Sequence, residues 1–159
     1  MSPDRIRIDS FLLADGVKVC DGKLYIHGGG WNFLNVMDPK AARPISLAGR
    51  VIVPWETVER ELKLVIGLEH VEAGTVLERV PIIQIVMQAQ SRPDHPESLE
   101  TATPFVVDIP GIGFFHPGEY AFVISHEGEE LARTRFQVNF VETDAPVAEG
   151  TEATPTASR

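Results

Sequence analysis

Apolar residues recur at every second position in short blocks between Arg5 and Phe140, and this alternation limits the chain to a β fold. In the clearest block, Leu62, Leu64, Ile66 and Leu68 point to one face and alternate with Lys63, Val65, Gly67 and Glu69 on the other. Glycine, proline, aspartate and asparagine separate the blocks, and these residues favour turns. About eight blocks without a long helical period predict an all-β fold: an antiparallel two-sheet sandwich of immunoglobulin-like type, with a barrel as the alternative.

The alternating pattern ends near Phe140, and this gives the expected domain boundary. A chain of 159 residues suits one domain, which we place at residues 5–141. Residues 142–159 contain proline, alanine, threonine, glycine and glutamate but no aromatic residue. Because such a segment cannot bury enough apolar surface to offset its ordering entropy, we expect a disordered acidic tail.

Charge and hydropathy exclude two classes of partner. The formal net charge is −9, from 14 basic and 23 acidic residues, so the surface should repel a nucleic-acid backbone. No run of about 20 apolar residues is present to cross a membrane. The single cysteine, Cys20, cannot form an internal disulfide, and the first residues lack the apolar core of a signal peptide. We therefore expect a cytoplasmic protein that binds neither nucleic acid nor membrane.

The string His27-Gly28-Gly29-Gly30-Trp31 is the most conspicuous motif. It matches a pattern that builds the oxyanion hole of some esterases, but no serine lies in the Gly-x-Ser-x-Gly motif that such enzymes need. It is not a phosphate loop either, because no Gly-Lys-Ser/Thr follows. The favoured interpretation is that the glycines permit a bulge or the close approach of another backbone or aromatic ring.

The five histidines show none of the short spacings that place two ligands on one metal ion. The paired carboxylates Glu59/Glu61 and Glu129/Glu130 fit solvated turns and edges, and no nucleophile motif is present. We therefore predict no catalytic residue, no metal site and no cofactor, and the sequence favours a protein that is not an enzyme. A small metal-dependent enzyme remains the alternative, with His27, His116 or His126 acting beside nearby carboxylates.

Aromatic residues provide the remaining candidates for a binding surface. Trp31 and Trp55 either cap the core or anchor an interface. Phe114 and Phe115 are adjacent, so on a strand one of the two would face solvent. The candidate binding residues are His27, Gly28, Gly29, Gly30, Trp31, Trp55, Phe115 and His116.

Two strings resemble a family of small, largely actinobacterial proteins known only as a domain of unknown function. They are the segment Lys23–Trp31, with its flanking Leu12–Asp15 and Pro44–Leu47, and the segment Pro117–Phe122. The resemblance spans residues 6–140 and implies no reaction, cofactor or catalytic residue. The sequence therefore favours a noncatalytic binding or assembly module, whose partner is an unknown protein or a second copy of the chain; a small-ligand carrier is a further alternative.

Overall fold

The computed structural model describes residues 5–90 and 100–142, and nearly all of its regular structure is β. No helix in these two ranges is long and apolar enough to cross a membrane. The predicted tail lies outside the described residues, except for Glu142. The elements in chain order are β1 (Arg7–Ala14), β2 (Gly16–Cys20), β3 (Lys23–His27), β4 (Phe33–Val36), β5 (Arg43–Val53), the 3-10 helix η1 (Trp55–Thr57), β6 (Glu61–Glu72), β7 (Thr75–Gln88), β8 (Thr101–Ile112), β9 (Gly118–His126) and β10 (Glu129–Phe140).

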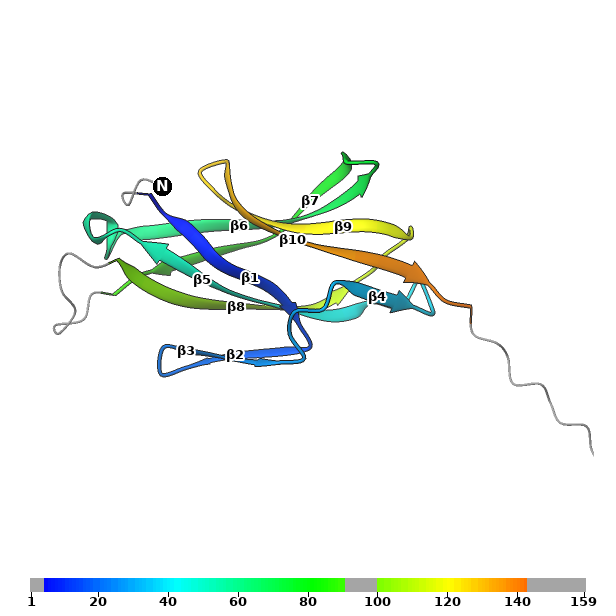
Figure 1. Ribbon diagram of the computed structural model, residues 1–159, viewed down its shortest axis with the longest axis horizontal. Helices are drawn as coiled ribbons and strands as arrows, with labels where there is room; N and C mark the ends of the chain where they lie inside the picture. The colour runs from blue at the N-terminus through cyan, green and yellow to red at the C-terminus, as the bar shows by residue number, and fades with distance from the viewer. Residues whose placement is uncertain (1–4, 91–99, 143–159) are drawn as a thin grey trace, which may run out of the picture.

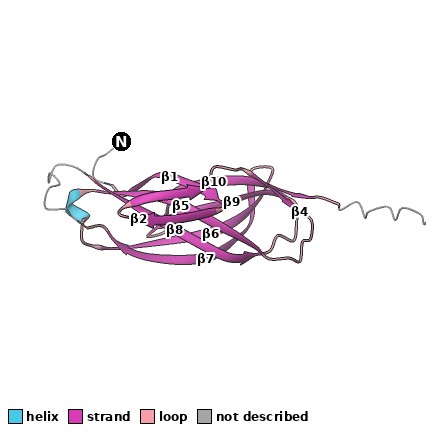
Figure 2. Ribbon diagram, turned by 90° about the horizontal axis from the view of Figure 1, so that it is seen from below, coloured by secondary structure: helices cyan, strands magenta, loops and turns pink. Residues whose placement is uncertain are grey.

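Two sheets face each other, which confirms the predicted sandwich. One sheet has the strand order β1-β5-β8, and the other has the order β4-β10-β9-β6-β7. The hairpin of β2 and β3 forms a small third sheet beside β5 and β8 (Figures 1 and 2). Two details differ from the prediction. The described residues form ten strands instead of about eight, and β4 pairs with β10 in parallel, whereas their other strand pairs are antiparallel.

The core forms where the alternating side chains of the two sheets meet. Leu62, Leu64 and Ile66 of β6 are fully or almost fully buried, as the pattern predicts. Phe136 of β10 lies at the centre of an aromatic group and contacts the rings of Trp31, Phe114, Tyr120 and Phe122. This packing joins β9 and β10 to the core through aromatic contacts.

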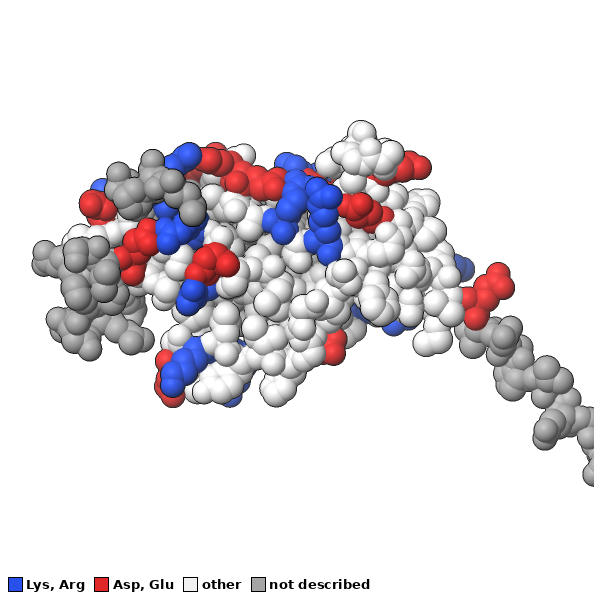
Figure 3. Space-filling view, in the orientation of Figure 1, with Lys and Arg blue, Asp and Glu red and all other residues white. Residues whose placement is uncertain are grey.

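The outer face of the five-stranded sheet carries a buried carboxylate. Glu69 of β6 is 0% exposed and forms ion pairs with Arg79 of the adjacent strand β7 and with Arg133 of β10, which lies beyond β9. Arg133 also pairs with Glu130 through two hydrogen bonds of 2.7 Å. Figure 3 shows basic side chains gathered between acidic ones on this part of the surface. The arginines of this face are therefore neutralised within the chain.

Candidate functional site

The three glycines of the conspicuous motif lie between β3 and β4, where the chain passes close to the end of β1. Gly28 has a φ of +58°, and a side chain there would overlap the carboxylate of Asp15. A side chain on Gly29 would overlap that of Ile26, whereas Gly30, with a φ of +83°, faces open space. The Gly30 N–H donates to the Leu13 carbonyl at 2.8 Å, so this amide is already used. The glycines thus meet local steric and conformational demands.

The structure separates the other predicted residues. His27 is exposed at the end of β3, and Trp31 is half-buried with its ring edge-on to Phe136, at a centroid distance of 6.0 Å. Trp55 lies in η1, at the opposite end of the sandwich from the β8–β9 connection (Figure 2). His126 bonds to the Lys63 carbonyl at 2.9 Å. These residues do not form one site.

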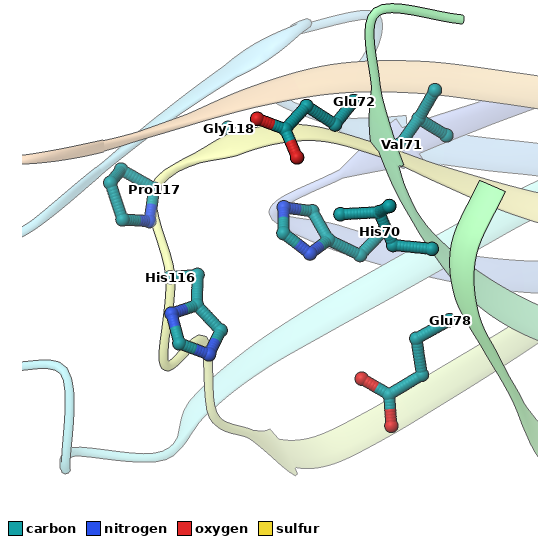
Figure 4. A pocket seen from close by; sticks show the side chains of 8 residues that line it. His70, Val71, Glu72, Glu78, His116, Pro117 and Gly118 are labelled. Atoms are coloured by element: carbon teal, nitrogen blue, oxygen red, sulfur yellow. The ribbon is translucent and has the colours of Figure 1, made fainter. Parts of the chain in front are cut away.

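Phe115 and His116 do lie together, in the connection between β8 and β9. Phe115 is 72% exposed, and its ring lies over Gly113. His116 lines an open pocket of about 670 Å³ between this connection and the β6–β7 hairpin (Figure 4). We call it the His70 pocket; its lining residues are His70, Val71, Glu72, Leu77, Glu78, His116, Pro117 and Gly118.

Cross-strand pairing builds the centre of the His70 pocket. His70 of β6 lies opposite Glu78 of β7 on one side and Tyr120 of β9 on the other. The His70 ring stacks on Tyr120, with centroids 4.6 Å apart, and is nearly parallel to the ring of His116, 6.0 Å away. Gly118, with a φ of +141°, leaves room for the His70 ring, since a side chain there would contact its Nε2 at 3.0 Å.

Tyr120 fixes the two histidines relative to each other. Its hydroxyl donates to the His116 carbonyl at 2.9 Å while its ring supports His70. Burial raises the pKa of Tyr120, and the negative charge of Glu78 acts in the same direction. Tyr120 is therefore a neutral hydrogen-bond donor at physiological pH.

Two carboxylates, Glu72 and Glu78, reach the His70 pocket without a counter-ion. Neither forms an ion pair or hydrogen bond with another residue of the described ranges. In the part of the chain that the structure describes, no three His, Cys, Asp or Glu side chains converge as metal ligands. Sequence reasoning missed His70 because only the strand register brings it beside His116 and Tyr120.

The second candidate surface is the free edge of β7, the last strand of the five-stranded sheet. Among the described residues, no strand pairs with its outer side. Five large apolar side chains of this strand are exposed, namely those of Val76, Leu77, Val80, Ile83 and Val86. Figure 2 shows β7 running along one margin of the molecule. A long apolar edge of this kind is a template for pairing with another strand.

The two halves of β7 differ in regularity. Register shifts occur where β7 passes Ile66/Gly67 and His70/Val71, and Pro81 lies beside the first of them. Such bulges and prolines obstruct pairing along an edge. From Ile83 to Gln88 the register with β6 is unbroken. We call these six residues the β7 edge; Ile83 faces inward at 41% exposure and Val86 outward at 54%.

A family model matches residues 9–139, nearly the whole described domain. It represents a family of unknown function, DUF6941. The chain belongs to this family. Among curated proteins, none has a significantly similar sequence. The expected membership of a family without an assigned function is thus confirmed.

Several solved structures resemble this DUF6941 domain at low identity. An alkylpurine DNA glycosylase from Pseudomonas fluorescens is 12% identical, with 84% of this chain and 30% of that chain covered and a TM-score of 0.44. A β-glucosidase from intestinal bacteria is 15% identical over 87% of this chain and 17% of that chain, with a TM-score of 0.46. An immunoglobulin-like protein from Pseudomonas aeruginosa is 14% identical over 87% of this chain and 100% of that chain, with a TM-score of 0.42. The chain spans less than a third of the first two, and these likenesses concern the fold alone.

Proposed function

We propose that this DUF6941 domain is a noncatalytic assembly module that associates with a second copy of itself through the β7 edge. The observation that carries the proposal is the regular and apolar strand segment from Ile83 to Gln88, whose outward backbone groups have no strand partner among the described residues. Two of its apolar side chains are exposed, Ile83 on the inner face of the sheet and Val86 on the outer face. Pairing with another strand would give these backbone groups hydrogen-bond partners and would bury the apolar side chains.

Charge favours a second copy as the occupant. The chain carries a formal charge of −9, so most faces of two copies repel each other. By contrast, β7 contains one acidic and one basic residue, Glu78 and Arg79, and the β7 edge contains neither. Two copies can therefore approach along this strand with little repulsion between like charges.

Antiparallel pairing of the β7 edge with itself is also sterically consistent. A two-fold axis normal to the sheet keeps inner side chains on the inner face. In a register centred on Ile85, Ile83 lies opposite Met87 of the second copy, and Gln84 lies opposite Val86 of the second copy. The two five-stranded sheets then become one continuous sheet with a closed, two-fold interface.

Sedimentation velocity of the full chain, from about 1 µM to 1 mM, tests the proposal. We expect a concentration-dependent species of twice the 17.5 kDa monomer mass. Val86→Lys removes apolar area and brings two like charges to the same face near the axis, so it should raise the dimer dissociation constant at least about tenfold. The side chain is exposed, so the variant should keep the β spectrum of the parent in circular dichroism.

Phe33→Lys provides the matched control. Phe33 is an exposed apolar residue of β4, at the opposite edge of the same sheet, and receives the same charge change. The dimer dissociation constant of the Phe33→Lys variant should stay within about twofold of that of the parent. A protein that remains monomeric over the whole range overturns the proposal, as does an equal loss of dimer in both variants.

We also propose that the protein acts in the bacterial cytoplasm. The support for this location is the lone Cys20, which forms no disulfide, together with the resemblance of the Lys23–Trp31 string to a largely actinobacterial family.

A further inference from the structure

Two imidazole rings, those of His70 and His116, line the His70 pocket and are nearly parallel, with an angle of 7° between their planes. The buried Tyr120 ring stacks on His70 at an angle of 16° and supports it. Hydrogen bonding of the Tyr120 hydroxyl and the space left by Gly118 hold this arrangement in place. Stacked rings attract flat groups and cations that lie against their faces.

The charges around these rings are negative. In Figure 4, Glu72 and Glu78 lie on opposite sides of the His70 ring, and neither has a counter-ion among the described residues. Within residues 5–90 and 100–142, no lysine or arginine lines the pocket. Arg79 is adjacent to Glu78 in sequence, but on the other face of the sheet it pairs with Glu69. The negative charge of the two carboxylates is therefore not neutralised by any basic residue of the described ranges.

We propose that the His70 pocket binds a guanidinium group. A guanidinium is planar, can lie against an imidazole face, and presents N–H donors in a geometry that matches a carboxylate. An alkylammonium has the charge without the plane. A metal ion would need three converging ligands, and the described residues contain no such group. The acidic chain also steers cations toward its surface.

This site is separate from the self-association proposed above. The pocket uses Leu77 and Glu78, in the irregular half of β7, whereas the dimer uses residues 83–88. The guanidinium can belong to a small molecule or to an arginine side chain of a protein, and both present the same chemistry. Failure of one proposal therefore leaves the other standing.

Isothermal titration calorimetry of the full chain at low ionic strength tests the site with three probes. Agmatine carries a guanidinium and an ammonium, whereas cadaverine carries two ammonium groups at the same total charge. Acetyl-Gly-Arg-Gly-amide presents the arginine side chain alone. We expect saturable agmatine binding at one site per chain, with cadaverine at least about threefold weaker. Tighter binding of the peptide indicates a protein source, and tighter binding of agmatine indicates a small molecule.

Charge-neutralising variants assign the binding to the pocket. Glu72→Gln and Glu78→Gln should each weaken agmatine binding at least about threefold. Glu56→Gln is the control, because it removes the same charge from an exposed residue of η1 at the far end of the molecule. The proposal is overturned if neither guanidinium probe saturates, if cadaverine binds as tightly as agmatine, or if Glu56→Gln causes the same loss.

Discussion

Alanine substitutions in the three-glycine run should destabilise the domain in an order set by local sterics. Gly28→Ala combines a positive φ with an overlap against Asp15, Gly29→Ala has only an overlap, with Ile26, and Gly30→Ala has only a positive φ. The three variants therefore separate two physical costs that a run of identical residues otherwise hides.

The magnitudes follow from these two costs. A left-handed backbone costs a non-glycine residue about 1–2 kcal/mol, and an overlap in a packed site about 1–3 kcal/mol. Replacing glycine by alanine also lowers the conformational entropy of the unfolded chain, which stabilises the fold by about 0.4–1 kcal/mol. The free energy of unfolding should thus fall by about 2–3 kcal/mol for Gly28→Ala and by about 1 kcal/mol for Gly30→Ala. Gly29→Ala should lie between them, because it meets an overlap with the Cγ2 methyl of Ile26 but does not require a left-handed backbone.

Urea titration monitored by circular dichroism measures these differences. Gly74→Ala is the matched control, since Gly74 has a φ of +80° and faces open space at the tip of the β6–β7 hairpin. It should behave like Gly30→Ala. If Gly28→Ala unfolds no more readily than Gly74→Ala, the close approach of Gly28 to Asp15 does not matter, and the structural interpretation of the glycines is wrong.

Three further predictions concern the core and the outer face. Glu69→Gln should lower the free energy of unfolding, measured in urea, by about 2 kcal/mol, because Arg79 and Arg133 lose their buried partner charge but remain partly hydrated. An unchanged free energy of unfolding would show that these two ion pairs do not stabilise the fold. Phe136→Ala should cost about 3–5 kcal/mol while exposed Phe33→Ala stays within about 0.5 kcal/mol, and similar losses would contradict the assigned core. Because the pKa of Tyr120 is raised in the folded state, its neutral hydroxyl favours folding below about pH 10, and this contribution disappears as the pH rises through the folded-state pKa. In unfolding titrations at alkaline pH, the free energy of unfolding should therefore fall less with rising pH for Tyr120→Phe than for the parent.

Local alternation predicted the sandwich, but it could not give the order of the strands. The segment Ile83–Gln88 alternates as clearly as Leu62–Leu68, and yet β6 is central and β7 is at the edge. The parallel pairing of β4 with β10 is equally invisible, since Phe33 lies opposite Gln137, far away in the sequence. Alternation reports which face of a strand is buried and carries no information on its neighbours.

The candidate site was predictable only in part. Because Phe114 and Phe115 are adjacent, the sequence predicts that one of the two faces solvent, and the structure exposes Phe115. His116 is also among the candidate residues of the sequence. His70, however, is one histidine in an ordinary alternating strand, and its role depends on the register that sets it opposite Tyr120. The motif His27–Trp31 is unusual in composition, but Gly28 and Gly29 are explained by the nearby side chains of Asp15 and Ile26, and Gly30 by its positive φ.

Hydrogen exchange along β7 tests the assembly proposal most directly, because it reports on the backbone groups that pairing would engage. Amide exchange of the full chain should be compared at concentrations well below and well above the dimer dissociation constant. We expect exchange in residues 83–88 to slow at high concentration, while β4, at the other edge of the sheet, is unchanged. Exchange rates in residues 83–88 that do not depend on concentration, in a sample that contains dimer, would contradict the proposal.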